Sequence, residues 1–219
     1  MSRLNLAMWI GCTHSEGPGP RFALWTQGCL LRCPGCCNPQ MWPLLPRHVL
    51  DAAEVMAMVD AARREHGIEG VTFLGGEPFL QARGLAELAR RCRAAGLTVM
   101  VFTGFWREQL VDDAYAGASE LLAACDLLVD GPFLAAEPET ERNWAGSRNP
   151  RFHFLTGAYT PGIERDPRYR PSAEVRIGPD GMLRVNGWPV ELVDGTPEPA
   201  DRPGGVTPGR APDRDPSRP

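Results

Sequence analysis

The stretch CLLRCPGCCN, residues 29–38, places four of the chain's seven cysteines within nine consecutive positions. An odd number of cysteines, most of them in one short segment, favours metal binding or redox chemistry over a framework of disulfides. Thiolates bind soft or borderline metals, so zinc, copper(I) and iron–sulfur clusters are the candidates. The loop is therefore a candidate metal site.

The spacing of these cysteines favours an iron–sulfur cluster over zinc. A structural zinc site usually has four ligands, often from two CxxC pairs, whereas Cys29, Cys33 and Cys36 form one CxxxCxxC motif with no second pair. Cys37 is a poor fourth ligand, because adjacent side chains of an extended loop point to opposite sides. Three thiols on one loop suit a four-iron cluster with one iron left open. Zinc, and thiols that are reactive or merely structural, remain as alternatives.

Helical and strand patterns alternate after this loop. Residues 51–67 predict an amphipathic helix with Asp51 as its N-cap, and residues 82–96 predict a second helix. Apolar runs that predict strands begin near residues 71, 97 and 126. This alternation predicts an α/β fold of parallel strands with crossover helices. The 219 residues fall short of the roughly 250 of an eight-unit barrel, so an open, partial (β/α) barrel or a doubly wound sheet is expected.

The C-terminal part differs in composition from the rest. Residues 173–187 hold two alternating runs around Pro179, Asp180 and Gly181, which predict an antiparallel hairpin. Residues 195–219 are rich in proline and glycine and poor in apolar side chains, so they are expected to be disordered. We therefore expect one domain over residues 1–194, followed by a disordered tail.

Composition excludes several classes of function. A net charge of −4 and a pI near 5.6 give no basic surface for nucleic acid. No run approaches the roughly 18 apolar residues of a membrane span, so no membrane partner and a cytoplasmic location are expected. All 23 basic residues are arginine, which excludes Schiff-base chemistry and a phosphate-binding loop of the Walker type.

The segment GGEP, residues 75–78, ends the first predicted strand after the cysteines. Glycines at a strand end permit close approach of the backbone to a ligand, and Glu77 can place a carboxylate against a ligand ammonium group. GGE alone is weak evidence, since most such turns are only turns. GGE in the first predicted strand after the CxxxCxxC loop is a much more specific signal than GGE alone.

Five motifs in order carry a family resemblance: GPGPRFALWTQGCLLRCPGCCN, VTFLGGEPFLQ, VMVFTGF, LLVDGPF and GSRN. Together they cover about residues 16–155. The chain resembles the radical S-adenosylmethionine enzymes, and within them the small activating proteins of glycyl-radical enzymes, of the anaerobic ribonucleotide reductase type.

The resemblance implies a [4Fe-4S] cluster held by Cys29, Cys33 and Cys36, whose fourth iron binds the amino and carboxylate groups of S-adenosylmethionine. The residues it implies along the same cavity are Gly75, Gly76 and Glu77 at the methionine ammonium, then Thr103, Asp130, Gly146, Ser147 and Asn149. Reductive cleavage would give methionine and a 5′-deoxyadenosyl radical that abstracts a hydrogen. The cofactors supply this chemistry, so no side chain needs to be an acid or base.

The same resemblance implies the partners, and several alternative functions remain open beside it. It implies a glycyl-radical protein or peptide as the substrate, and a reductant such as flavodoxin or ferredoxin. An alternative keeps the chemistry and changes the target to a peptide or small metabolite in a biosynthetic pathway. A non-catalytic iron–sulfur electron carrier is a further class, although such proteins ordinarily hold their clusters with four cysteines. A zinc-binding structural protein is the last alternative.

Overall fold

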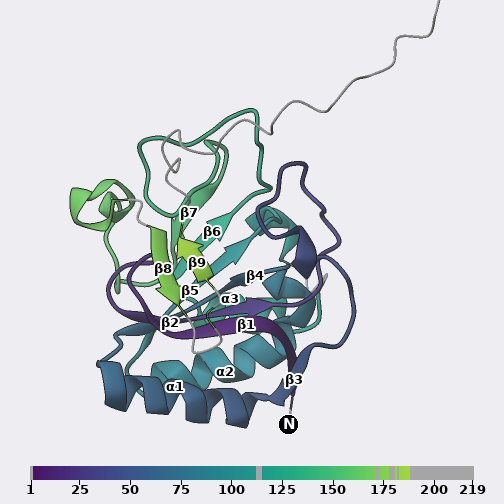
Figure 1. Cartoon of the computed structure of the whole chain (residues 1–219), viewed down its shortest axis with the longest axis vertical. Helices are drawn as coiled ribbons and strands as arrows, with labels where there is room; N and C mark the ends of the chain where they lie inside the picture. The colour runs from purple at the N-terminus through teal and green to yellow at the C-terminus, as the bar shows by residue number, and fades with distance from the viewer. Residues whose placement is uncertain (1, 112–114, 171–172, 178–180, 182, 188–219) are drawn as a thin grey trace, which may run out of the picture.

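The computed structural model describes residues 2–111, 115–170, 173–177, 181 and 183–187. Their strands form a seven-stranded sheet and a separate two-stranded sheet (Figure 1). The predicted domain end at residue 194, the predicted tail and most of the predicted hairpin turn lie outside the described residues. Within those residues, no helix is both long and apolar enough to cross a bilayer.

The main sheet has the order β3-β1-β2-β4-β5-β6-β7. Its strands are β1 (Arg3–Thr13), β2 (Arg21–Thr26), β3 (His48–Asp51), β4 (Gly70–Gly75), β5 (Thr98–Thr103), β6 (Leu127–Asp130) and β7 (Arg151–Phe154). The helices are α1 (Ala52–His66), α2 (Ala82–Ala94) and α3 (Ala118–Ala124). Short 3-10 turns are η1 (Pro39–Met41), η2 (Pro78–Gln81), η3 (Arg107–Gln109), η4 (Ile163–Arg165) and η5 (Pro167–Tyr169).

The predicted alternation of strands and helices is confirmed in the middle of the sheet. Strands β2, β4, β5 and β6 run parallel, and α1, α2 and α3 lie in the connections between them. The sheet also has antiparallel members that the sequence did not predict. Strand β1 pairs antiparallel with both β2 and β3, and β7 pairs antiparallel with β6. The fold is therefore α/β with a mixed sheet around a parallel centre.

Helix α1 begins and ends where its sequence predicts. The Asp51 N–H donates to Glu54 Oε2 at 2.7 Å, which completes a capping box. Gly67 ends the helix in the left-handed conformation at φ +65°, and its N–H donates to the Arg63 carbonyl. Local capping signals therefore mark both ends of this helix, while its buried side chains pack on the core.

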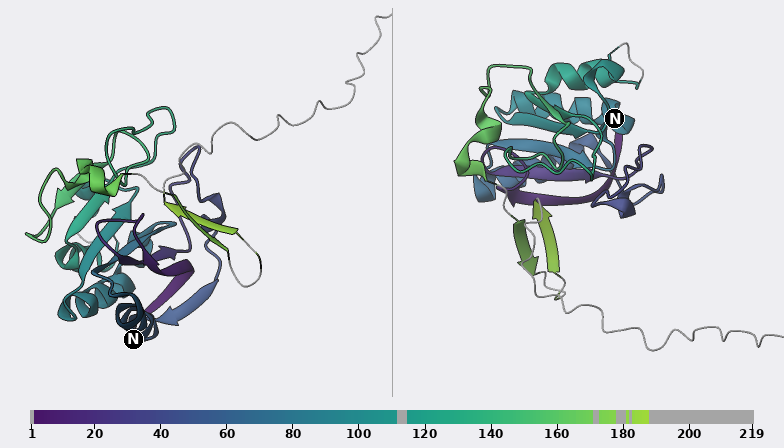
Figure 2. Two further views of the ribbon diagram at one scale, coloured as in Figure 1. Left: turned by 60° about the vertical axis from the view of Figure 1, so that its left-hand side comes forward. Right: turned by 90° about the horizontal axis from the view of Figure 1, so that it is seen from above.

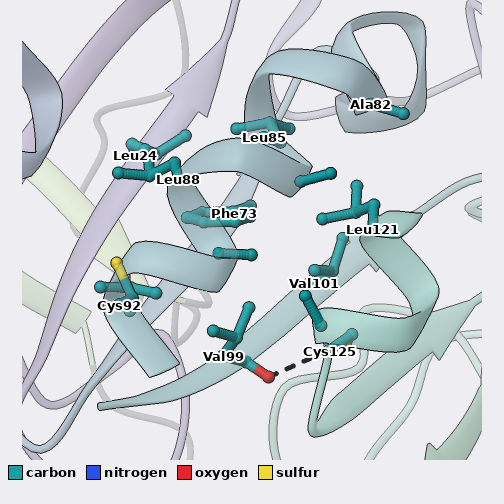
Figure 3. Packing of buried hydrophobic residues seen from close by; sticks show 14 of the residues in the cluster. Leu24, Phe73, Ala82, Leu85, Leu88, Cys92, Val99, Val101, Leu121 and Cys125 are labelled. Atoms are coloured by element: carbon teal, nitrogen blue, oxygen red, sulfur yellow. Dashed lines mark hydrogen bonds between the residues drawn. The ribbon is translucent and has the colours of Figure 1, made fainter. Parts of the chain in front are cut away.

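The main core lies between the helices and one face of the sheet. Figure 3 shows Leu85 and Leu88 of α2 among side chains of the strands, including Leu24, Phe73 and Val101. Because strand side chains alternate between faces, their neighbours Trp25, Leu74 and Phe102 lie on the other face of the sheet. That second face is the one available for a site.

Two cysteines outside the loop belong to this core, as the apolar patterns predict. Cys92 of α2 and Cys125 after α3 are both fully buried. The Cys125 thiol lies 3.8 Å from the Val99 carbonyl oxygen (Figure 3). Burial raises the pKa of both thiols, to about 12 for Cys92, so they behave as small apolar residues.

Strands β8 (Ala173–Ile177) and β9 (Leu183–Gly187) pair antiparallel in a sheet of their own that projects from the main body (Figure 2). Polar contacts tie this pair to the segment between β1 and β2. Thr13 Oγ1 donates to Glu174 Oε2 at 2.7 Å, and the Gly187 N–H donates to Glu16 Oε1 at 2.7 Å. The pair is therefore attached to the end of β1 and to the segment that leads into β2, instead of extending the main sheet.

Candidate active site

A cavity of 490 Å³ opens at the carboxyl ends of the parallel strands, on the face of the sheet opposite the helices. Its walls include one large apolar side chain from each parallel strand. These are Trp25 of β2, Leu74 of β4, Phe102 of β5 and Val129 of β6. The carboxyl ends of parallel strands are the usual place for ligands in α/β sheets. This cavity is the candidate active site.

The three cysteines of the CxxxCxxC motif all border this cavity. Cys29 is buried, with 7% of its surface exposed, and Cys33 and Cys36 are half-buried. Burial raises the pKa of the Cys29 thiol, so the thiolate form is disfavoured unless a cation lies beside it. Cys37 also borders the cavity but is exposed, and the prediction that it is not a ligand stays a prediction.

Backbone hydrogen bonds fix the cysteine loop at the cavity. Gly28 turns the chain after β2 at φ +104°, and its N–H donates to the Met41 carbonyl at 2.8 Å. The next N–H, that of Cys29, donates to the Trp42 carbonyl at 3.1 Å. Within the loop the Cys36 N–H donates to the Cys33 carbonyl. The loop is therefore anchored at both ends and closed by its own turn.

The donor set fits a multi-iron cluster better than a single ion. Among the described residues, no three Cys, His, Asp or Glu side chains are close enough together to hold one metal ion. A zinc ion needs every sulfur at about 2.3 Å from itself, so these thiols as placed do not form a zinc site. A [4Fe-4S] cluster binds one thiolate at each iron, which allows three thiols to be spaced around one cavity.

The two glycines of GGEP allow close backbone packing against the end of β2 and the residue Gly28 that follows it. Gly75 has φ +109°, and a Cβ there would lie 2.6 Å from Trp25 Cα. A Cβ on Gly76 would lie 2.3 Å from the Gly28 carbonyl oxygen. The Gly76 N–H donates to the Thr26 carbonyl, and the Glu77 N–H donates to the Gly28 carbonyl, both at 2.8 Å. The close backbone approach inferred from sequence is thus made to the end of β2, which brings Glu77 beside the cysteine loop.

Glu77 places a buried carboxylate in the cavity wall, with 1% of its surface exposed. It accepts hydrogen bonds from the Phe79 N–H at 3.0 Å, from Thr103 Oγ1 at 2.8 Å and from the Gly104 N–H at 2.9 Å. All three donors are neutral, and burial outweighs them to raise the pKa of Glu77 to about 7. A cationic group in the cavity would favour the ionised form.

Thr103 and Asp130 end adjacent strands but lie differently with respect to the cavity. Thr103 borders it, whereas Asp130 is not among its lining residues. The Asp130 carboxylate is fully buried and accepts from the Arg107 N–H at 2.7 Å and from Arg151 Nη2 at 2.6 Å. Asp130 therefore lies behind the cavity lining and binds Arg151 of strand β7, and its predicted role at S-adenosylmethionine stays a prediction.

The GSRN turn lies partly at the cavity and partly behind it. Gly146 and Ser147 border the cavity, while Asn149 does not. Ser147 Oγ donates to Asn149 Oδ1 at 2.7 Å and accepts from the Leu134 N–H at 3.1 Å. Asn149 also donates to the Pro132 carbonyl. Its role in the structure is to hold the turn against the segment that follows β6.

Sequence reasoning missed two buried polar residues of the cavity. Glu16 and Asn186 are both buried and both border it, and Asn186 Nδ2 lies 3.2 Å from Glu16 Oε1. They are far apart in the sequence and meet only because β9 packs against the segment before β2. No local sequence pattern predicts such a pair. The nearest sequence signal for it was the position of Glu16 at the start of the segment EGPGP.

Comparisons with known proteins agree with this geometry. The family described as a 4Fe-4S single cluster domain matches residues 15–153, which include the cysteine loop, GGEP and the GSRN turn. The chain is 29% identical over 146 residues to the anaerobic ribonucleoside-triphosphate reductase-activating protein of Vibrio cholerae, covering 64% of this chain and 92% of that protein. The Escherichia coli protein of that name is 28% identical over 145 residues, with the same coverage. The pyruvate formate-lyase-activating enzyme of Listeria monocytogenes is 39% identical over 97 residues, which are 40% of this chain and 39% of that enzyme.

Proposed function

Because the chain belongs to the 4Fe-4S single cluster domain family, we propose that it is a radical S-adenosylmethionine enzyme that activates a glycyl-radical partner. One observation carries the proposal: Cys29, Cys33, Cys36 and the buried carboxylate of Glu77 border a single cavity. The names of its relatives support the activating role, since both kinds are called activating proteins or enzymes.

The residues of the cavity have distinct tasks in this proposal. Cys29, Cys33 and Cys36 would hold the cluster, and when bound it would supply the electron for reductive cleavage of S-adenosylmethionine to methionine and a hydrogen-abstracting 5′-deoxyadenosyl radical. Glu77 accepts the methionine ammonium, and Thr103 keeps its carboxylate oriented through the bond to Oε1. The aromatic and aliphatic walls keep water away from the reacting groups.

We also propose that the parallel centre of the sheet is an open, partial (β/α) barrel. Two features support this architecture. The α-helices of the described residues all lie on one face of the sheet, and the cavity occupies the other face at the carboxyl ends of the strands. The antiparallel pair β8–β9 borders the cavity through Val185, Asn186 and Gly187 and closes part of its edge.

Formation of 5′-deoxyadenosine and of a glycyl radical tests the function. The protein is reconstituted with iron and sulfide without oxygen, reduced with dithionite and given S-adenosylmethionine and the glycyl-radical enzyme encoded nearest to it. We expect 5′-deoxyadenosine by chromatography and a glycyl radical on the partner by electron paramagnetic resonance. Turnover with no glycyl radical, but with modification of a peptide or metabolite, would favour the alternative target. Binding of zinc in place of iron would overturn the proposal.

The raised pKa of Glu77 predicts how S-adenosylmethionine binding depends on pH. The ligand ammonium pairs with the ionised carboxylate, so binding below the pKa of about 7 must first release a proton. We expect the affinity to fall about fivefold from pH 7 to pH 6, measured by calorimetry on the reconstituted protein. The matched variant Glu77→Gln should bind more weakly and show no such slope. An equal slope in this variant would exclude Glu77 as its source.

A further inference from the structure

We propose that the outer side of the cysteine loop is the docking surface for an acidic electron-transfer protein of the flavodoxin type. This outer loop surface consists of Leu30, Arg32, Leu44, Leu45 and Arg47. The inference rests on the proposed function, since it names the face through which the site receives its electron.

Three large apolar side chains of the outer loop surface are exposed to an unusual degree. Leu30, Leu44 and Leu45 are 59%, 64% and 66% exposed. None of them borders the cavity, whereas Leu31 does. Leu30 therefore faces away from the site while its neighbour faces into it. Large apolar side chains gathered at one exposed place, with charged residues around them, are typical of protein–protein interaction sites.

This apolar centre lies directly against the proposed cluster ligand Cys29. Leu30 follows Cys29 in the chain, and Leu44 packs on Gly28, where a Cβ would lie 2.8 Å from Leu44 Cδ2. The backbone bonds from Gly28 and Cys29 to residues 41 and 42 hold the two segments together. A protein seated on Leu30 and Leu44 is thus within one residue of the site that it would reduce, without entering the cavity.

The charges of the outer loop surface select an acidic partner. The chain has no Asp or Glu between Glu16 and Asp51, although its net charge is −4. Arg32 and Arg47 are exposed in this stretch, and neither forms an ion pair with another described residue. Unpaired cations at the rim of an apolar patch attract and orient an acidic protein surface.

The step that this surface serves is a transfer of one electron. The reduced flavin of the carrier loses one electron and is oxidised to that extent, and the site held by Cys29, Cys33 and Cys36 gains it. No bond forms or breaks in this step. The glycyl-radical partner needs access to the cavity itself, whose lining includes Trp144, Tyr169 and Asn186 but no residue of the outer loop surface. The two partners therefore contact different residues.

The test compares two reductants on charge-reversed variants of the reconstituted protein. We expect Arg32→Glu/Arg47→Glu to slow cluster reduction by photoreduced flavodoxin about tenfold at low ionic strength, and to weaken flavodoxin binding in calorimetry similarly. Leu45→Glu should also slow cluster reduction by flavodoxin and weaken flavodoxin binding. Dithionite, a small anionic reductant that needs no docking surface, should reduce both variants at the wild-type rate at high ionic strength, where its charge is screened. The matched control Arg64→Glu/Arg90→Glu makes the same charge change at exposed positions on α1 and α2.

Each other outcome overturns the inference. Equal slowing in the control would mean that net charge, and not this surface, governs the reaction. Slow reduction by dithionite would mean that the variants damage the site itself. Normal reduction by flavodoxin with loss of glycyl-radical formation would assign the surface to the glycyl-radical partner. A wild-type protein that assembles no cluster would refute the proposed function separately, before either reductant is compared.

Discussion

A Cys33→Ala variant is expected to assemble no [4Fe-4S] cluster and to make no measurable 5′-deoxyadenosine. Cys33 lies at the cavity between Cys29 and Cys36, and a cubane with one open iron needs all three thiolates. Loss of a group that only hydrogen-bonds to a metal ligand costs about 10- to 100-fold in affinity or activity, and loss of a direct ligand should exceed that range. Cys29→Ala and Cys36→Ala should behave in the same way.

The matched control for these variants is Cys37→Ala. Cys37 is on the same loop and borders the same cavity, but it is exposed and directly follows a proposed ligand. We expect this variant to keep the wild-type iron content, brown colour and rate of 5′-deoxyadenosine formation. Iron and sulfide analysis with electron paramagnetic resonance of the reduced protein measures the cluster directly. A full cluster in Cys33→Ala, or none in Cys37→Ala, would show that the ligands have been assigned wrongly.

Most of the parallel centre could be predicted because its signals are local. The cap at Asp51, the end of α1 at Gly67 and the apolar runs of β4, β5 and β6 lie within the segments that they define. Strands β1, β3 and β7 were missed because their pairing depends on partners elsewhere in the chain. Only tertiary contacts decide whether such a segment becomes a strand at the side of the sheet.

The same difference between local and distant contacts explains which parts of the site could be predicted. The loop with Cys33 and the turn with Glu77 were recognised because each motif is continuous in sequence. Asp130 was assigned to the cavity, whereas its carboxylate binds Arg151, 21 residues away, on a strand that the pattern did not reveal. An ion pair with a distant residue decides where a carboxylate points, and spacing within one segment carries no information about it.

A Gly76→Ala variant should show the second large effect, because Gly76 packs closely against the backbone just before the cysteine loop. The new Cβ would lie 2.3 Å from the Gly28 carbonyl oxygen, 2.8 Å from the Gly28 carbonyl carbon and 3.0 Å from the Thr26 carbonyl oxygen. All three atoms belong to the backbone, so no side chain can rotate to make room. We expect the free energy of unfolding to fall by about 3 kcal/mol or more, measured by denaturant titration of the protein without cluster.

The same variant should also lose the cluster, because relief of the clash requires the end of β4 to move away from Gly28. That movement breaks the bond from the Glu77 N–H to the Gly28 carbonyl and displaces the residue before Cys29. Gly157→Ala is the matched control, since Gly157 has no positive φ and a Cβ there meets nothing within 4 Å. Its stability should change by no more than about 0.5 kcal/mol, with normal iron content. If Gly76→Ala were as stable as this control and bound the full cluster, the close packing of β4 on the cysteine loop would not be what positions the site.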